Sequence, residues 1–133
     1  MRALRILGLM ALVGLVANCG GGGGGGNDPV PGLLTLTLNT PNSDDGALLF
    51  RVTGGVVDSV YATGMIQDGS YTVQPTYTRI VVAGNIVDGA VAQIKVADVG
   101  DVASYSVIME QVAVRITNTQ RSPVGYSISV SAP

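Results

Sequence analysis

Histidine and tryptophan are absent from this chain of 133 residues, and cysteine and phenylalanine each occur once. The absence of histidine removes the commonest general base and the commonest metal ligand of proteins. Aromatic residues make up only 5% of the chain, and its 7 Lys and Arg residues do not outnumber its 9 Asp and Glu residues. The chain therefore lacks the stacking platforms and the basic surface that nucleic-acid binding requires. We expect a protein that is not an enzyme, uses no cofactor and does not bind nucleic acid.

Charged residues are scarce as well, at 12% of the chain, whereas hydrophobic residues make up 47%. Disordered proteins show the opposite balance, because they lack the apolar side chains that a folded core buries. The length is sufficient for one ordinary domain and not for two. The sequence thus predicts one folded domain, preceded by a targeting segment.

The first residues have the composition of an export signal. Arg2 and Arg5 precede an uncharged apolar run of 12 residues, from Ile6 to Ala17. A helix needs about 20 apolar residues to cross a bilayer, so this run is too short for a membrane span. A positively charged start followed by a short apolar core is typical of a signal peptide, which we assign to residues 1–18. The alternative is a buried N-terminal helix, which would be expected to show a polar face.

Leu15-Val16-Ala17-Asn18-Cys19 resembles the bacterial lipobox, in which an aliphatic residue and two small residues precede a cysteine. Asn18 stands where that family usually has Gly, Ala or Ser. The resemblance implies that Cys19 receives a diacylglycerol, with fatty acids such as palmitate, and becomes the first residue of the mature protein. The alternative is an unpaired thiol in a secreted protein, because a single cysteine cannot form an internal disulfide.

The lipoprotein resemblance also implies a location in the cell envelope, with the membrane as a partner through the lipid anchor. Two or three acyl chains hold a protein firmly to a bilayer, whereas one chain is marginal. Gly20, rather than Asp, follows the cysteine. In the lipoprotein resemblance this is compatible with transport to the outer membrane or the cell surface, if the organism has two membranes.

Seven consecutive glycines, Gly20 to Gly26, follow the cysteine. A phosphate-binding loop would need a strand before it and a helix with Lys or Ser/Thr after it, and the sequence has neither pattern. Together with Asn27 and Asp28, the glycines make nine flexible residues, which span about 15–18 Å. This is enough to lift a domain clear of lipid headgroups. We therefore interpret residues 19–32 as the lipidated cysteine with a flexible linker, and residues 33–133 as the folded domain.

From residue 33 onward the apolar residues recur with a period of two. This alternation predicts half-buried β-strands, in which Val, Ile, Thr and Tyr are enriched. The clearest strands are 34–38, 48–52, 92–96 and 124–130, and we expect others at 56–62, 70–73, 77–83, 104–109 and 111–117. The inward-facing phase shifts within the last pair, which predicts a β-bulge or a tight bend near Glu110.

Clusters of turn-forming residues separate these runs, among them Gln67-Asp68-Gly69, Asp88-Gly89 and Val99-Gly100-Asp101. Eight or nine short strands at this spacing predict an all-β fold, namely an antiparallel two-sheet sandwich of the jelly-roll or immunoglobulin-like type. A closed barrel is the alternative.

The stretch from Val81 to Gly84, followed by Asp88 to Val96, resembles bacterial cohesin-like domains. In that family a strand ending in Gly and a short turn precede an alternating strand and a Tyr-containing hairpin. Tyr105-Ser106-Val107 and Gln111-Val112-Ala113 stand where this hairpin would fall. The resemblance covers most of residues 33–130 and implies a sandwich that docks a partner protein. It assigns no binding residues.

Asp44 and Asp45 are the weak candidates for a metal site, because Ca²⁺ takes several oxygen ligands from loops. The surrounding Asn-Ser-Asp-Asp-Gly does not match the spacing of a known calcium loop. The alternative, which we prefer, is that these residues form an ordinary turn, since Asp bonds readily to its own backbone. Adjacent carboxylates in a turn are expected to point apart into water, so we assign no catalytic residue and no metal.

Two kinds of surface residue could contact a protein or carbohydrate partner. Small hydroxyl side chains occupy the expected outward positions of several strands: Thr35, Thr37, Ser104, Ser106, Ser127 and Ser129. Such side chains lose little conformational entropy when a partner lies against them. Tyr61, Tyr71 and Tyr77 could line a second surface, or pack at the rim of the core. We expect a lipid-anchored envelope protein with a non-catalytic structural or binding role, or else a cohesin-like docking module.

Overall fold

The computed structural model describes residues 26–64 and 66–133. The expected signal peptide at 1–18, the expected lipidation site Cys19 and residues 20–25 of the glycine run lie outside the described residues. Within the described part of the chain, no helix is long and apolar enough to cross a membrane.

Nine β-strands and one short 3₁₀ helix, η1, follow one another along the described chain. They are β1 (Gly32–Asn39), β2 (Asp45–Thr53), β3 (Ser59–Ala62), β4 (Ile66–Val73), β5 (Tyr77–Ile86), β6 (Gly89–Val96), η1 (Val99–Ser104), β7 (Ser106–Val114), β8 (Gln120–Arg121) and β9 (Ser127–Ser131).

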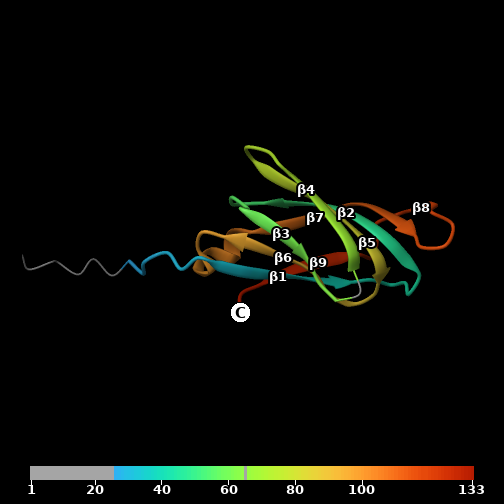
Figure 1. Ribbon diagram of the computed structural model, residues 1–133, viewed down its shortest axis with the longest axis horizontal. Helices are drawn as coiled ribbons and strands as arrows, with labels where there is room; N and C mark the ends of the chain where they lie inside the picture. Colours follow the sequence, from blue (N-terminus) through green and yellow to red (C-terminus); the bar gives the residue numbers. More distant parts are fainter. Residues whose placement is uncertain (1–25, 65) are drawn as a thin grey trace, which may run out of the picture.

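The strands form two antiparallel sheets that pack against each other (Figure 1). The four-stranded sheet has the order β3-β6-β1-β9, and the five-stranded sheet has the order β4-β5-β2-β7-β8. Each sheet therefore has two edge strands, and the fold is the predicted two-sheet sandwich and not a closed barrel.

The core lies between the sheets and consists of the residues that alternation predicts to face inward. The inward side chains of β1 and β2 are all 2% exposed or less: Leu34, Leu36, Leu38, Leu48, Phe50 and Val52. Residues from β5 and β6, such as Ile80 and Ile94, complete this cluster. Because successive side chains of a strand point to opposite faces, the residues between them are left for the outer surfaces.

The predicted bulge near Glu110 is confirmed. Opposite β7, Leu49 pairs with Gln111 and Phe50 pairs with Met109, so that Glu110 is the extra residue of the ladder. The predicted strands at 104–109 and 111–117 are therefore one strand, β7, whose side-chain phase changes at the bulge.

Three local predictions differ from the structure. The residues 67–69, expected to form a turn, belong to β4, where Asp68 pairs with Ala83 and Gly69 with Val82. Ser104 ends η1 and does not start a strand. Val124, expected to face inward, lies before β9 and is 83% exposed. In each case a short polar or apolar pattern fits two local structures, and pairing with a neighbouring strand decides between them.

The two ends of the sandwich differ. Residues 26–31 and the C-terminus lie at one end, which we call the tether end, and β8 lies at the other, the distal end (Figure 1). At the tether end the Val30 N–H donates to Asp98 Oδ1 (3.1 Å), and the Val99 N–H donates to the Val30 carbonyl (2.9 Å). These bonds attach the last residues of the linker to η1.

Candidate functional site

The outer face of the four-stranded sheet brings together the hydroxyl residues that the sequence singles out on β1 and β9. Thr37 lies directly opposite Ser129, and Thr35 lies opposite Ser131. Ser127 pairs with Asn39 at the same edge. Since Leu36 and its partner Val130 face the core side, the flanking pairs face outward. We call this set the hydroxyl face: Thr35, Thr37, Asn39, Ser127, Ser129 and Ser131.

Ser104 and Ser106 do not belong to this face, which corrects the prediction that grouped them with it. Ser106 pairs with Thr53 of β2 and lies in the five-stranded sheet, while Ser104 lies in η1. Sequence alternation shows that a residue faces outward, but it does not show which sheet the strand joins.

Longer polar side chains continue the hydroxyl face across the sheet. Gln93 of β6 lies opposite both Thr35 of β1 and Tyr61 of β3. Near the tether end, Tyr61 and Lys95 line an open cavity of about 290 Å³ with residues 31–33. The outer surface of this sheet is thus lined by hydroxyl side chains at β1 and β9, and it is hollowed where Tyr61 of β3 and Lys95 of β6 line the cavity.

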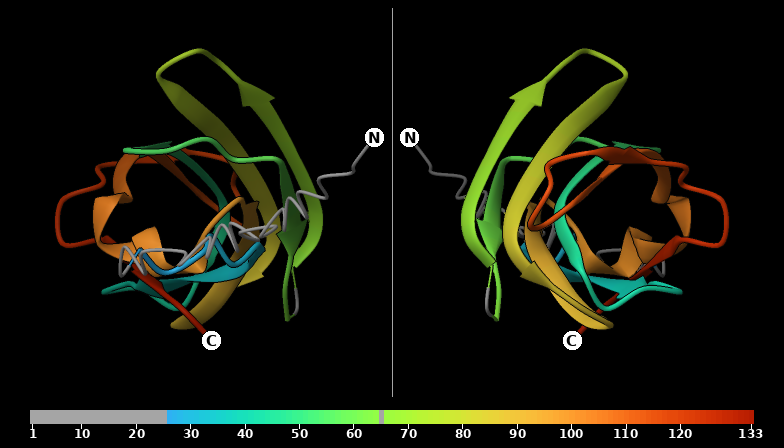
Figure 2. Two further views of the ribbon diagram at one scale, coloured as in Figure 1. Left: turned by 90° about the vertical axis from the view of Figure 1, so that its left-hand side faces the viewer. Right: turned by 90° about the vertical axis from the view of Figure 1, so that its right-hand side faces the viewer.

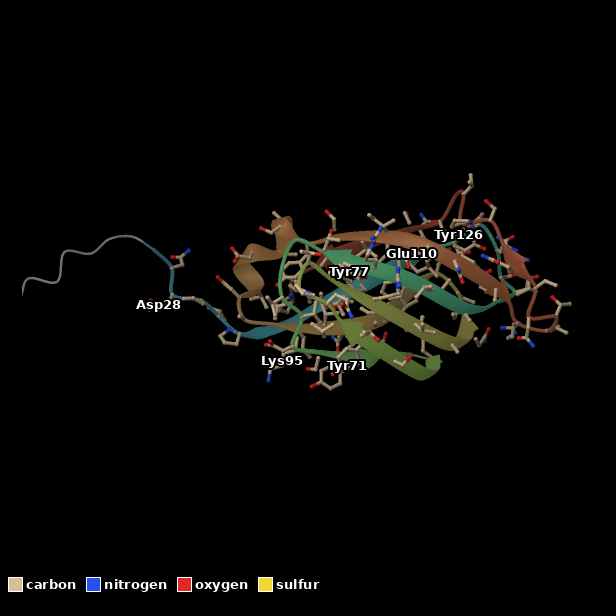
Figure 3. The ribbon with its side chains drawn as sticks, turned by 90° about the horizontal axis from the view of Figure 1, so that it is seen from above. Asp28, Tyr71, Tyr77, Lys95, Glu110 and Tyr126 are labelled. Carbon is tan, nitrogen blue, oxygen red and sulfur yellow. The ribbon has the colours of Figure 1, made fainter. Side chains whose placement is uncertain are left out.

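A buried polar cluster lies at the distal end, and Asp45 is its centre. This carboxylate is fully buried, unlike the water-facing turn residue that the sequence predicts. Thr40 Oγ1 donates to its Oδ2 (2.7 Å), while the Tyr126 hydroxyl (2.8 Å) and Arg121 Nη1 (2.9 Å) donate to its Oδ1. Figure 3 labels Tyr126 toward the end of the molecule far from Asp28. We call this the Asp45 cluster.

Asp44 contacts the same arginine from the outside. Arg121 Nη1 and Nη2 donate to the two carboxylate oxygens of Asp44, at 2.7 and 3.0 Å. The hydrogen bond from Arg121 lowers the pKa of the Asp44 carboxyl below its usual value. A lowered pKa in the folded state stabilises the fold above the ordinary pKa of Asp, and this contribution is lost as the pH falls through the lowered pKa.

The backbone around Gly46 holds the two aspartates in place. The Arg115 N–H donates to the Asp44 carbonyl (2.8 Å), and a Cβ atom on Gly46 would lie 2.4 Å from the Arg115 Cα. Strand β7 therefore approaches β2 so closely here that only glycine fits, and the pairing register shifts between Asp45 and Ala47. This irregularity turns the Asp45 side chain inward.

The Asp45 cluster bears on the two weak metal candidates. Both carboxylates of Asp44 and Asp45 already accept hydrogen bonds from Arg121, whose positive charge occupies the place that a cation would take. Across residues 26–64 and 66–133, no three His, Cys, Asp or Glu side chains are grouped so that they could hold a metal ion. The contacts favour the structural interpretation of this acidic pair. Arg121 and Tyr126, which complete it, have no signal in the sequence that links them to a turn 76 or 81 residues earlier.

A second polar cluster surrounds Glu110 on the outer face of the five-stranded sheet (Figure 3). Arg79 donates two hydrogen bonds to the Glu110 carboxylate, at 2.9 and 3.2 Å, and Arg51 Nε lies 3.3 Å from it. The guanidinium carbons of both arginines lie 5.4 and 5.6 Å from the centre of the Tyr77 ring. The bulge residue Glu110 is thus the ion-pair partner of two arginines. These contacts leave its side chain only 18% exposed.

The three tyrosines considered as one surface lie apart. Tyr61 is on the outer face of the four-stranded sheet, and Tyr77 packs with arginines on the outer face of the five-stranded sheet. Tyr71 pairs with the buried Ile80, so it lies on the inner side of β4, where it is nevertheless 43% exposed. A single tyrosine-lined binding surface is therefore wrong for this fold.

No protein-family model matches the chain, and searches of curated proteins and of solved structures find no match either.

Proposed function

We propose that this chain is a lipid-anchored protein of the cell envelope whose β-sandwich has a non-catalytic structural or binding role. The observation that carries the proposal is that the linker joins the sandwich at one of its two ends. The linker enters at the tether end and is bonded there to η1 through Val30, Asp98 and Val99. An anchor at Cys19 would hold the domain by this end and direct the distal end away from the bilayer.

The clusters of charged side chains support a role without catalysis. A catalytic acid or base must have its reacting group within reach of a substrate. The carboxylate of Asp45 accepts three hydrogen bonds from protein groups, and that of Glu110 lies between two arginines. Groups paired in this way contribute to the fold. On the outer face of the four-stranded sheet, the side chains that remain for a partner include those of the hydroxyl face, Gln93, Tyr61 and Lys95.

The anchor is tested by replacing Cys19 with serine. We expect Cys19→Ser to abolish labelling by a fatty-acid probe and to move the protein from the membrane fraction to the soluble fraction, because a hydroxyl cannot replace the thiol that the lipoprotein resemblance implies is acylated. Asn18→Ala is the matched control: it keeps the thiol and restores a small residue before it, so it should be labelled at least as well as the wild type. An unlabelled wild-type protein, or a mutant that stays in the membrane fraction, would contradict the proposal.

The hydroxyl face favours the alternative function, a docking module that recruits one partner protein in the manner of the cohesin resemblance. Its outward pairs Thr37–Ser129 and Thr35–Ser131 present short side chains over two neighbouring strands. A partner could approach the sheet closely there, and few flexible side chains would have to be ordered.

This docking function predicts a face-specific effect of bulky charge. We expect Thr37→Arg and Ser129→Arg each to abolish reproducible capture of one partner from an envelope extract while leaving the melting temperature unchanged, because both positions face solvent. Ser106→Arg is the matched control, since it places the same side chain on the five-stranded sheet and should preserve capture. Equal loss with all three variants, or no specific capture by the wild type, would argue for a structural role.

A further inference from the structure

The hairpin formed by β4 and β5 extends beyond the rest of the sandwich, with β4 on its outer side (Figure 2). Strand β4 is an edge of the five-stranded sheet and pairs only with β5. Strand β3 comes close to its first half, where a Cβ atom on Gly69 would lie 3.4 Å from the Ala62 Cβ. Among residues 26–64 and 66–133, no strand lies beside the outer edge of the second half of β4, from Ser70 to Val73.

The hydrogen-bonding pattern of the hairpin determines which backbone groups face that edge. The Gln74 N–H donates to the Tyr77 carbonyl (2.8 Å), so these two residues form a hydrogen-bonded pair. In an antiparallel ladder such pairs alternate with non-hydrogen-bonded pairs. Thr72 therefore bonds to its partner Arg79, whereas Tyr71 and Val73 direct their N–H and C=O groups away from β5.

The second half of this edge strand has none of the usual protection against strand pairing, because the one irregularity in its ladder lies before it, between Ile66 and Asp68. Natural edge strands carry Lys, Pro, inward-pointing charge or a bulge at the exposed positions. Gly69-Ser70-Tyr71-Thr72-Val73 contains no charged residue and no proline. Tyr71 and Val73 are 43% and 48% exposed. The segment thus presents free backbone groups together with apolar side chains.

We propose that β4 is a homodimerisation edge, at which the β4 strands of two copies of this chain pair antiparallel about a two-fold axis beside Thr72. In this register Tyr71 of one copy exchanges backbone hydrogen bonds with Val73 of the other, and the same pair is repeated across the axis. The two five-stranded sheets become one continuous sheet.

In this register the side chains of one β4 strand are well matched to those of a second β4 strand. This match is the reason that the proposed partner at this edge is a second copy of the chain. Tyr71 lies opposite Val73 of the other copy, and Thr72 lies opposite Thr72. Aromatic pairs with β-branched residues and Thr–Thr pairs both stabilise antiparallel strands. Arg79, the nearest cation on β5, is already bound to Glu110, so no like charges meet at the seam.

Disulfide trapping tests the register in the full chain carrying Cys19→Ser, where an added cysteine is the only thiol. The two Thr72 residues would form a non-hydrogen-bonded pair with Cα atoms about 4.5 Å apart, within the range of a disulfide. The two Ser70 residues would be offset by four residues, or about 13 Å, along the paired strands, so their Cα atoms would lie well beyond the range of a disulfide. Ser70→Cys is therefore a matched control on the same strand and the same face.

We expect mild oxidation to convert Thr72→Cys to a covalent dimer on a non-reducing gel at least ~10-fold faster than Ser70→Cys, since only the first pair meets the disulfide distance. Adding Val73→Lys to Thr72→Cys should slow this reaction, because lysine protects strand edges. Equal rates for the two cysteine variants, no dimer with either, or no effect of Val73→Lys would overturn the proposal. The experiment uses a chain without the anchor, so its outcome is independent of the proposed lipidation.

Discussion

Replacing Phe50 with alanine is expected to lower the free energy of unfolding by about 3–5 kcal/mol, which is a large part of the 5–15 kcal/mol typical of a small domain. Phe50 is the only phenylalanine in the chain and is fully buried. It lies on β2, which has β5 on one side and β7 on the other. The removed ring leaves a cavity that the paired strands on both sides cannot close, so the variant loses both buried area and packing contacts.

Urea unfolding of a soluble chain beginning at Pro29, followed by circular dichroism, measures this effect. The wild type should show a β-type spectrum and one cooperative transition. Ile116→Ala serves as the control, because Ile116 is 83% exposed and its truncation should change stability by less than about 0.5 kcal/mol. A loss below about 1 kcal/mol for Phe50→Ala would mean that the ring does not support the core.

Replacing Asp45 with alanine is expected to cost about 3 kcal/mol of stability, or about 15 °C in melting temperature. The carboxylate is the shared acceptor for Thr40, Arg121 and Tyr126. Alanine removes the acceptor that these donors share at a fully buried position, and a buried donor left unsatisfied retains the full cost of its desolvation. Arg121 keeps its hydrogen bonds to Asp44, so the loss falls mainly on Thr40 and Tyr126.

Asp44→Ala is the informative control for the Asp45 cluster. It also removes a carboxylate from Arg121, but the Asp44 side chain is 49% exposed, so water can replace it as an acceptor. We expect a clearly smaller loss of melting temperature than for Asp45→Ala. Equal effects of the two variants would show that the cluster acts through surface charge. A rise in melting temperature on adding calcium would instead mean that the cluster binds a cation.

The Asp45 cluster and the cluster around Glu110 also account for acidic residues that stand out in the sequence without an evident role. Glu110, the only glutamate, interrupts an apolar stretch at an outward position of β7, where it pairs with Arg51 and Arg79. Asp44 and the first residue of β2, Asp45, both form ion pairs with Arg121, which lies on β8 at the distal end. Each cluster joins strands that are distant in the sequence, which explains why neither was foreseen.

The alternation of apolar residues along the chain is sufficient to predict the all-β class, the inward residues of β1 and β2, and the bulge at Glu110. These properties follow from one local rule: side chains of a strand alternate with a period of two, so an apolar series identifies the buried face, and a break in the series identifies an extra residue. The structure confirms them through the burial of Leu34, Phe50 and their neighbours.

Which outward residues share a surface depends on how the strands pair in the folded sandwich. Thr37 and Ser129 meet because β1 pairs with β9, whereas Ser106 follows β7 into the other sheet. Tertiary structure likewise buried Asp45 beneath Thr40, Arg121 and Tyr126, and left the edge of β4 open. The physical reason is that strand pairing joins segments far apart in the chain, and its register depends on the packing of the whole sandwich, about which a local pattern carries no information.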